Sequence, residues 1–210
     1  ETDDSFSIGA MVTLRQLEEH PGLAAYTHGS VKEALRHIVG VQLRNLATVG
    51  GSIYSRFGFS DVLTLFLAMD CSVELYKGGI VSLQEYAERP YDRDILVRLI
   101  VKKTDAEYCY QSVRNSQTDI PVLTCAAARL ADGSYRVAIG ARPLKAVRFE
   151  FAAGKVPVPQ LAQTMADEVK QQIVTGSNMR GSAEYRRHLA GVLTKRAVLE
   201  LERHTAQEVN

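Results

Sequence analysis

The sequence has few cysteines and shows no pattern of metal ligands. Its three cysteines, Cys71, Cys109 and Cys125, are widely spaced and form no Cys-x-x-Cys pair. An odd number of isolated thiols builds neither a disulfide framework nor a thiolate cage for zinc or iron–sulfur. Each cysteine lies in an apolar run, which favours a small buried thiol. The five histidines lack the HExxH spacing. We therefore expect no metal centre, and any redox chemistry would need an organic cofactor.

The chain also lacks an excess of charge of one sign and any long hydrophobic run. With 25 basic and 24 acidic residues among 210, its formal net charge is +1. This balance argues against a protein that works by neutralising nucleic-acid phosphates. No apolar run approaches the roughly 20 residues that span a bilayer, and no secretory signal pattern stands at the N-terminus. We expect a soluble, cytoplasmic protein with no nucleic acid and no membrane among its partners.

Hydrophobic periodicity predicts a mixed structure in two parts. Short helices and a hairpin are expected before residue 102, and the polar stretch 102–107 marks a boundary. Beyond it, a meander of strands precedes two helices, and strands followed by helices indicate α+β packing. The predicted domains are residues 1–103 and 104–210. In the last helix, Tyr185-Arg-Arg-His188 is interpreted as a solvated basic face.

The paired glycines Gly50 and Gly51 are the feature that points to chemistry. Adjacent glycines can adopt positive φ and expose consecutive N–H groups, and Thr48 and Ser52 add hydroxyls. Such a nest suits a diphosphate or the carbonyl edge of a flavin, while Asp61 could accept a hydrogen bond from a ribose hydroxyl. The alternative is a glycine β-bulge followed by an N-capped helix, and spacing alone favours it. Neither GxGxxG nor GxxxxGK[ST] is present.

The glycine pair belongs to a longer motif. Leu43-Arg-Asn-Leu-Ala-Thr-Val-Gly-Gly-Ser-Ile53 is followed by Ser60-Asp61 and by Leu67-Ala-Met-Asp70, and further matches lie at 8–13, 93–96 and 179–193. This series resembles the flavin-binding subunit of molybdenum hydroxylases, the xanthine dehydrogenase and carbon monoxide dehydrogenase flavoprotein family. The resemblance implies an α+β fold: the later part of a PCMH-type FAD-binding domain, then a carbon monoxide dehydrogenase flavoprotein C-terminal-like domain whose antiparallel sheet is packed by two helices.

The resemblance also implies which residues contact FAD. Those expected at the cofactor are Thr48, Val49, Gly50, Gly51 and Ser52 on one loop, Asp61 after it, Leu96 and Val97 beside the isoalloxazine, and Gln111. Ser52 stands where the family usually has asparagine, and Gln111 falls near a position often held by lysine. No catalytic residue and no metal ligand are implied.

Function follows from the same resemblance. It implies FAD as cofactor, a molybdopterin-binding large subunit and a 2Fe-2S small subunit as partners, and electron relay from iron–sulfur clusters through FAD to NAD. The chain opens at Glu1 almost within a strand pattern, as a fragment would, and no glycine-rich loop for the FAD pyrophosphate precedes it. We therefore expect weak FAD binding, and no activity alone, unless that loop is supplied in trans. The alternative is a non-catalytic interaction module of the same family that holds no FAD.

Overall fold

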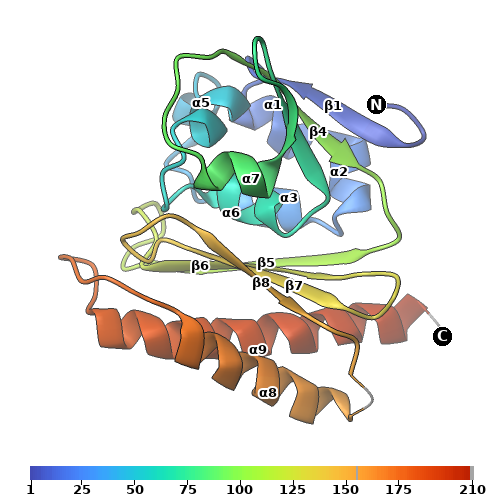
Figure 1. Ribbon diagram of the computed structural model, residues 1–210, viewed down its shortest axis with the longest axis vertical. Coiled ribbons are helices and arrows are strands. Elements are labelled where there is room, and N and C mark those ends of the chain that lie inside the picture. The colour runs from blue at the N-terminus through green and yellow to red at the C-terminus, as the bar shows by residue number, and fades with distance from the viewer. Residues whose placement is uncertain (155, 209–210) are drawn as a thin grey trace.

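The chain forms two α+β parts stacked one above the other (Figure 1). The computed structural model describes residues 1–154 and 156–208. Residues 155, 209 and 210, which belong to the second predicted domain, lie outside the described residues. Among the described helices, none is long and apolar enough to cross a membrane. The α+β class expected from the sequence is confirmed.

The first part is a four-stranded antiparallel sheet covered by short helices. The sheet order is β1-β4-β2-β3, with β1 at Ser5–Gly9, β4 at Leu96–Lys102, β2 at Cys71–Leu75 and β3 at Gly79–Ser82. Register places the apolar side chains in rows: Val101 of β4 lies opposite both Phe6 and Cys71, and all three are buried. Because side chains alternate along a strand, this row faces the helices and the next residues face outward. The helices are α1 (Leu14–Glu19), α2 (Pro21–Tyr26), α3 (Ser30–Leu35), α4 (Val41–Arg44), α5 (Val49–Tyr54), α6 (Asp61–Leu67) and α7 (Leu83–Glu88).

The second part is a four-stranded meander with two long helices on one face. Its strands β5 (Glu107–Val113), β6 (Leu123–Arg129), β7 (Tyr135–Gly140) and β8 (Val147–Phe151) pair in chain order, all antiparallel. Helices α8 (Val158–Gln172) and α9 (Ala183–Glu208) pack against one face, and α3 and α6 cover the other (Figure 1). An antiparallel sheet packed by two helices is the arrangement that the sequence predicts for this half.

The β6 sequence shows why the two parts are joined so closely. Leu123–Arg129 is a run of small and apolar residues without alternation, and all but Arg129 are buried. Alternate side chains contribute to two different cores: Ala126 packs with the first part, whereas Cys125 and Ala127 pack with α8 and α9. A strand covered on both faces has no solvent side to keep polar. All three cysteines are buried and unpaired, as the sequence predicts.

The prediction of a solvated basic face on the last helix is wrong for Arg186. Its side chain is completely buried, whereas the neighbouring Arg187 and His188 are exposed. The guanidinium donates to four acceptors: the carbonyl oxygens of Val122, Gly176 and Gly181, and Oδ1 of Asn178. Arg186 therefore holds the loop between α8 and α9 against the start of β6. Charge periodicity does not reveal this role, because the acceptors lie outside the helix.

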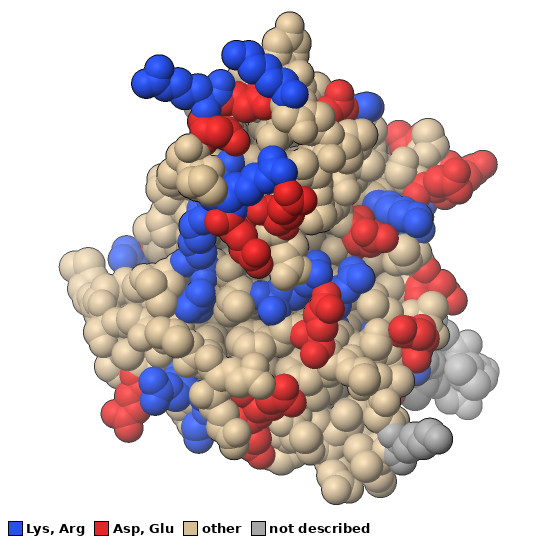
Figure 2. Space-filling model, viewed as in Figure 1, with Lys and Arg blue, Asp and Glu red and all other residues tan. Residues whose placement is uncertain are grey.

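Charges of both signs are interspersed on the visible surface. On the face drawn in Figure 2, blue and red side chains alternate, and among the described residues there no broad area carries a single sign. This distribution matches the near-zero net charge.

Candidate functional site

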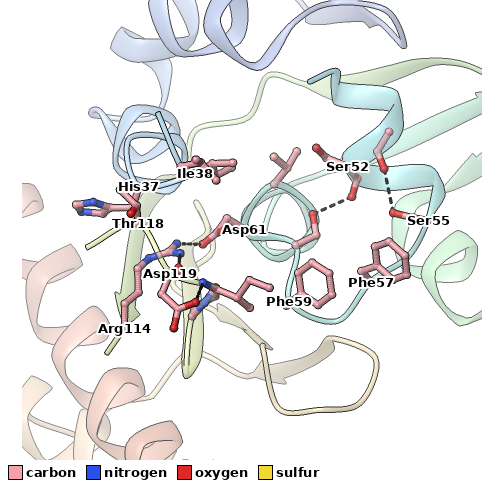
Figure 3. A pocket seen from close by; sticks show the side chains of 16 residues that line it. His37, Ile38, Ser52, Ser55, Phe57, Phe59, Asp61, Arg114, Thr118 and Asp119 are labelled. Atoms are coloured by element: carbon pink, nitrogen blue, oxygen red, sulfur yellow. Dashed lines mark hydrogen bonds and ion pairs between the residues drawn. The ribbon is translucent and has the colours of Figure 1, made fainter. Parts of the chain in front are cut away.

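A cavity of about 350 Å³ opens at one end of the contact between the two parts. Its walls come from residues 37–39 after α3, from α5, the loop at 55–60 and the first turn of α6, and from the segment 114–121 after β5 (Figure 3). Of the residues predicted to contact FAD, the described cavity wall includes Gly51, Ser52 and Asp61. Contacts between domains are preferred places for cofactor and small-molecule sites.

The paired glycines form neither a nest nor a β-bulge. They lie in the first turn of α5, and neither has positive φ. The Val49 and Gly50 amides donate to the Val12 and Ala10 carbonyls at 2.9 and 2.8 Å. The amides of the next two residues are also engaged: Gly51 donates to Thr48 Oγ1 and Ser52 to the Thr48 carbonyl, each at 3.1 Å. The prediction of free main-chain amides is therefore wrong: the chain at Ala10 and Val12 accepts from two of them, and Thr48, the N-cap of α5, accepts from the other two.

The absence of a side chain has a different effect at each of the two glycines. A Cβ on Gly50 would lie 2.7 Å from the Ala10 carbonyl oxygen and 2.8 Å from the Ala10 Cβ. Gly50 thus lets α5 approach the end of β1 closely. A Cβ on the exposed Gly51 would have Thr48 Oγ1 as its nearest neighbour, at 3.3 Å, beside the open cavity.

This difference predicts unequal losses of stability for two adjacent substitutions. Gly50→Ala should lower the free energy of unfolding by about 1–3 kcal/mol, because the added methyl group overlaps backbone. Gly51→Ala should change it by no more than about 0.5 kcal/mol, because the better helix propensity of alanine is offset by the tight 3.3 Å contact of its Cβ with Thr48 Oγ1. Urea unfolding of both variants measures the contrast. Equal losses would contradict the close approach of α5 to Ala10.

Asp61 is the buried acid of the cavity. It begins α6 directly after the N-cap Ser60, and 6% of the residue is exposed. Its Oδ1 accepts a hydrogen bond from the Tyr110 hydroxyl at 2.6 Å and forms an ion pair with Arg114 (Figure 3). Burial raises the pKa of the Asp61 carboxyl, and the charge of Arg114 opposes that rise.

Arg114 is a site residue that the sequence analysis missed. Its side chain is 7% exposed; Nη2 contacts Asp61, and Nη1 donates to the Asp119 carbonyl at 2.6 Å. Among the described residues, none accepts a hydrogen bond from its buried Nε. The residue stands just beyond β5, where no periodicity or motif marks it. Its pairing with Asp61 depends on two chain segments 53 positions apart.

The remaining cavity wall is mostly aromatic and apolar. The rings of Phe57 and Phe59 stack with centroids 5.1 Å apart, and both residues are about half exposed. His37 lies on the opposite side of the opening (Figure 3). Burial, with the charge of Arg36 as a further cause, lowers the pKa of His37 and so favours the neutral imidazole. The cavity combines an aromatic wall with one buried ion pair, a combination suited to a planar heteroaromatic group.

Three predicted residues lie away from this cavity. Leu96 is buried in β4 opposite Leu75, and the neighbouring Val97 accepts a hydrogen bond from the Ala10 amide through its carbonyl. Gln111 donates to Glu200 of α9 at 2.7 Å, on the other face of the second sheet. The described wall of the cavity contains none of the three. The described residues hold no cluster of histidine, cysteine, aspartate or glutamate that could bind a metal ion.

Two family descriptions match the chain in succession. Residues 1–104 match the FAD binding domain in molybdopterin dehydrogenase, and residues 108–201 match the CO dehydrogenase flavoprotein C-terminal domain. The cavity wall therefore draws on both matched segments, because Asp61 belongs to the first and Arg114 to the second.

Sequence relatives and solved structures agree with these matches. The Escherichia coli K12 protein YgfM is 29% identical over 187 residues, covering 89% of this chain and 69% of the relative. The xanthine dehydrogenase FAD-binding subunit of Escherichia coli O157:H7 is 28% identical, covering 94% and 74%. Quinoline 2-oxidoreductase from Pseudomonas putida 86 has a similar fold, with a TM-score of 0.84 at 22% identity over 97% of this chain and 77% of that one. Carbon monoxide dehydrogenase from Hydrogenophaga pseudoflava also gives 0.84 at 22%, over 96% and 76%. The chain belongs to the family of FAD-binding flavoprotein subunits of molybdenum hydroxylases.

Proposed function

We propose that this chain is the FAD-binding component of a molybdopterin-dependent dehydrogenase, and that the cavity beside α5 receives one ring system of the cofactor. The observation that carries this proposal is the pairing of the stacked Phe57 and Phe59 with the buried Asp61–Arg114 pair around one cavity. A planar ring with a polar edge would pack on the aromatic wall and lie beside Asp61 and Arg114, which line the same cavity.

The size of the cavity limits what it can hold. A volume of about 350 Å³ leaves room for one ring system and not for the whole dinucleotide. The α5 amides are occupied, so this segment offers the phosphates no free main-chain donors. When bound, FAD supplies electron acceptance and donation, while this chain supplies position and electrostatics. Phe57 and Phe59 would cover the ring, and Asp61 and Arg114 would orient its edge.

We infer the rest of the electron route from the family. The partners are a molybdopterin-binding large subunit and a 2Fe-2S small subunit, and electrons pass from the iron–sulfur clusters through FAD to NAD. Similarity to a xanthine dehydrogenase FAD-binding subunit supports this route. The choice of NAD is tested by reducing the flavin of the assembled complex and following its reoxidation by NAD⁺; no faster reoxidation than without NAD⁺ would exclude it.

A second candidate function is a non-catalytic interaction module of the same family that holds no FAD. The observation that favours it is the engagement of all four amides from Val49 to Ser52 within the chain. The two candidates differ in one measurable property, which is saturable binding of FAD.

Titration of the purified chain with FAD, followed by flavin absorbance and fluorescence, separates them. Tryptophan is absent from the sequence, so the flavin signal is read without indole emission. Gly51→Val, which adds a branched side chain to the cavity wall, should weaken binding by about tenfold or more, equivalent to about 1.4 kcal/mol. Gly9→Val is the matched control, because Gly9 is exposed and its added Cβ would have ordinary contacts. No saturable binding by the wild-type chain would favour the interaction module.

A further inference from the structure

The loop between α8 and α9 reaches the wall of the cavity. Arg180 in this loop contacts Asp119, with Nη2 and Nε lying 3.0 and 3.3 Å from Oδ1. The carbonyl of Arg180 also accepts a hydrogen bond from Asn115 Nδ2 at 3.3 Å. Both contacts end on the segment 114–121, which supplies one side of the cavity.

From Asp119 the contacts continue to the buried acid. The Asp119 carbonyl accepts from Arg114 Nη1 at 2.6 Å, and Arg114 pairs with Asp61. Arg180, Asp119, Arg114 and Asp61 thus form an unbroken series of polar contacts from the loop to the first turn of α6. Hydrogen bonding from Arg180 lowers the pKa of Asp119, so that carboxylate stays charged near neutral pH.

The loop that carries Arg180 is itself fixed. The buried Arg186 guanidinium bonds the Gly176 and Gly181 carbonyls and the Asn178 side chain, on both sides of Arg180. The Asn178 amide and the Gly181 amide also exchange hydrogen bonds with each other's carbonyls, each at 3.1 Å. An arginine on a fixed turn loses less conformational entropy when it forms an ion pair than an arginine on a mobile loop does.

We propose that Arg180 is a positioning residue for the cavity: by holding Asp119 it sets where Arg114 lies, and so it sets the affinity for the ring that the cavity binds. This inference rests on the proposed FAD function for its ligand, but not for its geometry. Because coupling between two sites is reciprocal, a ligand in the cavity also stabilises the loop at 176–181.

Arg180→Gln tests the proposal, with Arg187→Gln as the matched control. Both substitutions remove one positive charge, and the exposed Arg187, seven positions further along in α9, lies outside the series. Arg180→Gln should weaken FAD binding by about two- to fivefold, as expected for a partly exposed ion pair, while Arg187→Gln leaves it unchanged. Arg180→Lys keeps the charge but loses the two-nitrogen contact with Asp119, so its FAD affinity should lie between those of the two glutamine variants. Asp119→Asn combined with Arg180→Gln should weaken binding no more than the stronger single variant.

Hydrogen–deuterium exchange gives a readout that needs no cofactor. In the unliganded protein, Arg180→Gln should speed exchange across 114–121, and Arg187→Gln should not. With FAD bound, exchange at 176–181 should slow in the wild type and less so in Arg180→Gln. If the wild type binds no FAD, the proposed function fails, and exchange across 114–121 still decides the role of Arg180. Arg180→Gln indistinguishable from Arg187→Gln in exchange would overturn the proposal.

Discussion

Replacing Arg114 by alanine should lower the free energy of unfolding by about 3–5 kcal/mol. The substitution leaves the Asp61 carboxylate buried with the Tyr110 hydroxyl and without its counter-charge. Removing one partner of a buried pair costs more than removing both, because the remaining charge stays desolvated. Urea unfolding at pH 7 measures the loss, and an unchanged m-value would show that the denatured state is unaffected.

The pH dependence of this variant has a definite sign. Burial already raises the pKa of Asp61, and Arg114 opposes the rise, so removing Arg114 raises that pKa further. A carboxyl whose folded pKa lies above its unfolded value binds more protons when folded. Lowering the pH through that interval therefore stabilises the folded state. The deficit of Arg114→Ala should shrink as the pH falls from 7 toward the unfolded pKa of about 4.

A double variant provides the control for the ion pair. Asp61→Asn with Arg114→Met removes both charges and keeps an acceptor for Tyr110. This variant should recover most of the stability that Arg114→Ala loses, because no unpaired charge remains. A loss below about 1 kcal/mol in Arg114→Ala, independent of pH, would mean that solvent reaches Asp61 and that the pair is not buried.

Replacing Arg186 by methionine should lower the free energy of unfolding by about 3–5 kcal/mol, because several buried acceptors lose their donor together. Three of these acceptors are backbone carbonyls, on Val122, Gly176 and Gly181. A backbone carbonyl cannot rotate toward another donor as a side chain can. Methionine fills part of the volume but donates nothing. Thermal and urea unfolding both report the loss.

The neighbouring residue supplies a matched comparison. Arg187→Met makes the same chemical change on the exposed side of α9 and should alter stability by less than about 0.5 kcal/mol. Arg186→Lys should recover only part of the loss, because an ammonium group cannot reach acceptors spread around a planar guanidinium. Equal effects of the two methionine substitutions would contradict the burial of Arg186.

The engaged amides of α5 change how a cofactor can be held at the cavity. Capping by Thr48 and backbone bonds to residues 10 and 12 leave the helix start without spare main-chain donors. A ligand there meets aromatic rings and the Asp61–Arg114 pair instead. The two glycines therefore have different roles: Gly50 allows close packing of α5 against Ala10, and Gly51 leaves space at the cavity wall.

The class of fold, the burial of the cysteines and the family could all be predicted from the amino-acid sequence. These properties depend on local patterns: alternation in β2, apolar runs around Cys125, and a motif read along one stretch of chain. Three further features are seen only in the folded chain: the glycines belong to a helix, Arg186 is buried, and Arg114 contacts Asp61. Each of these features depends on segments far apart in the chain. Hydrophobic periodicity is a local pattern, so it cannot predict which distant acceptors a buried arginine contacts.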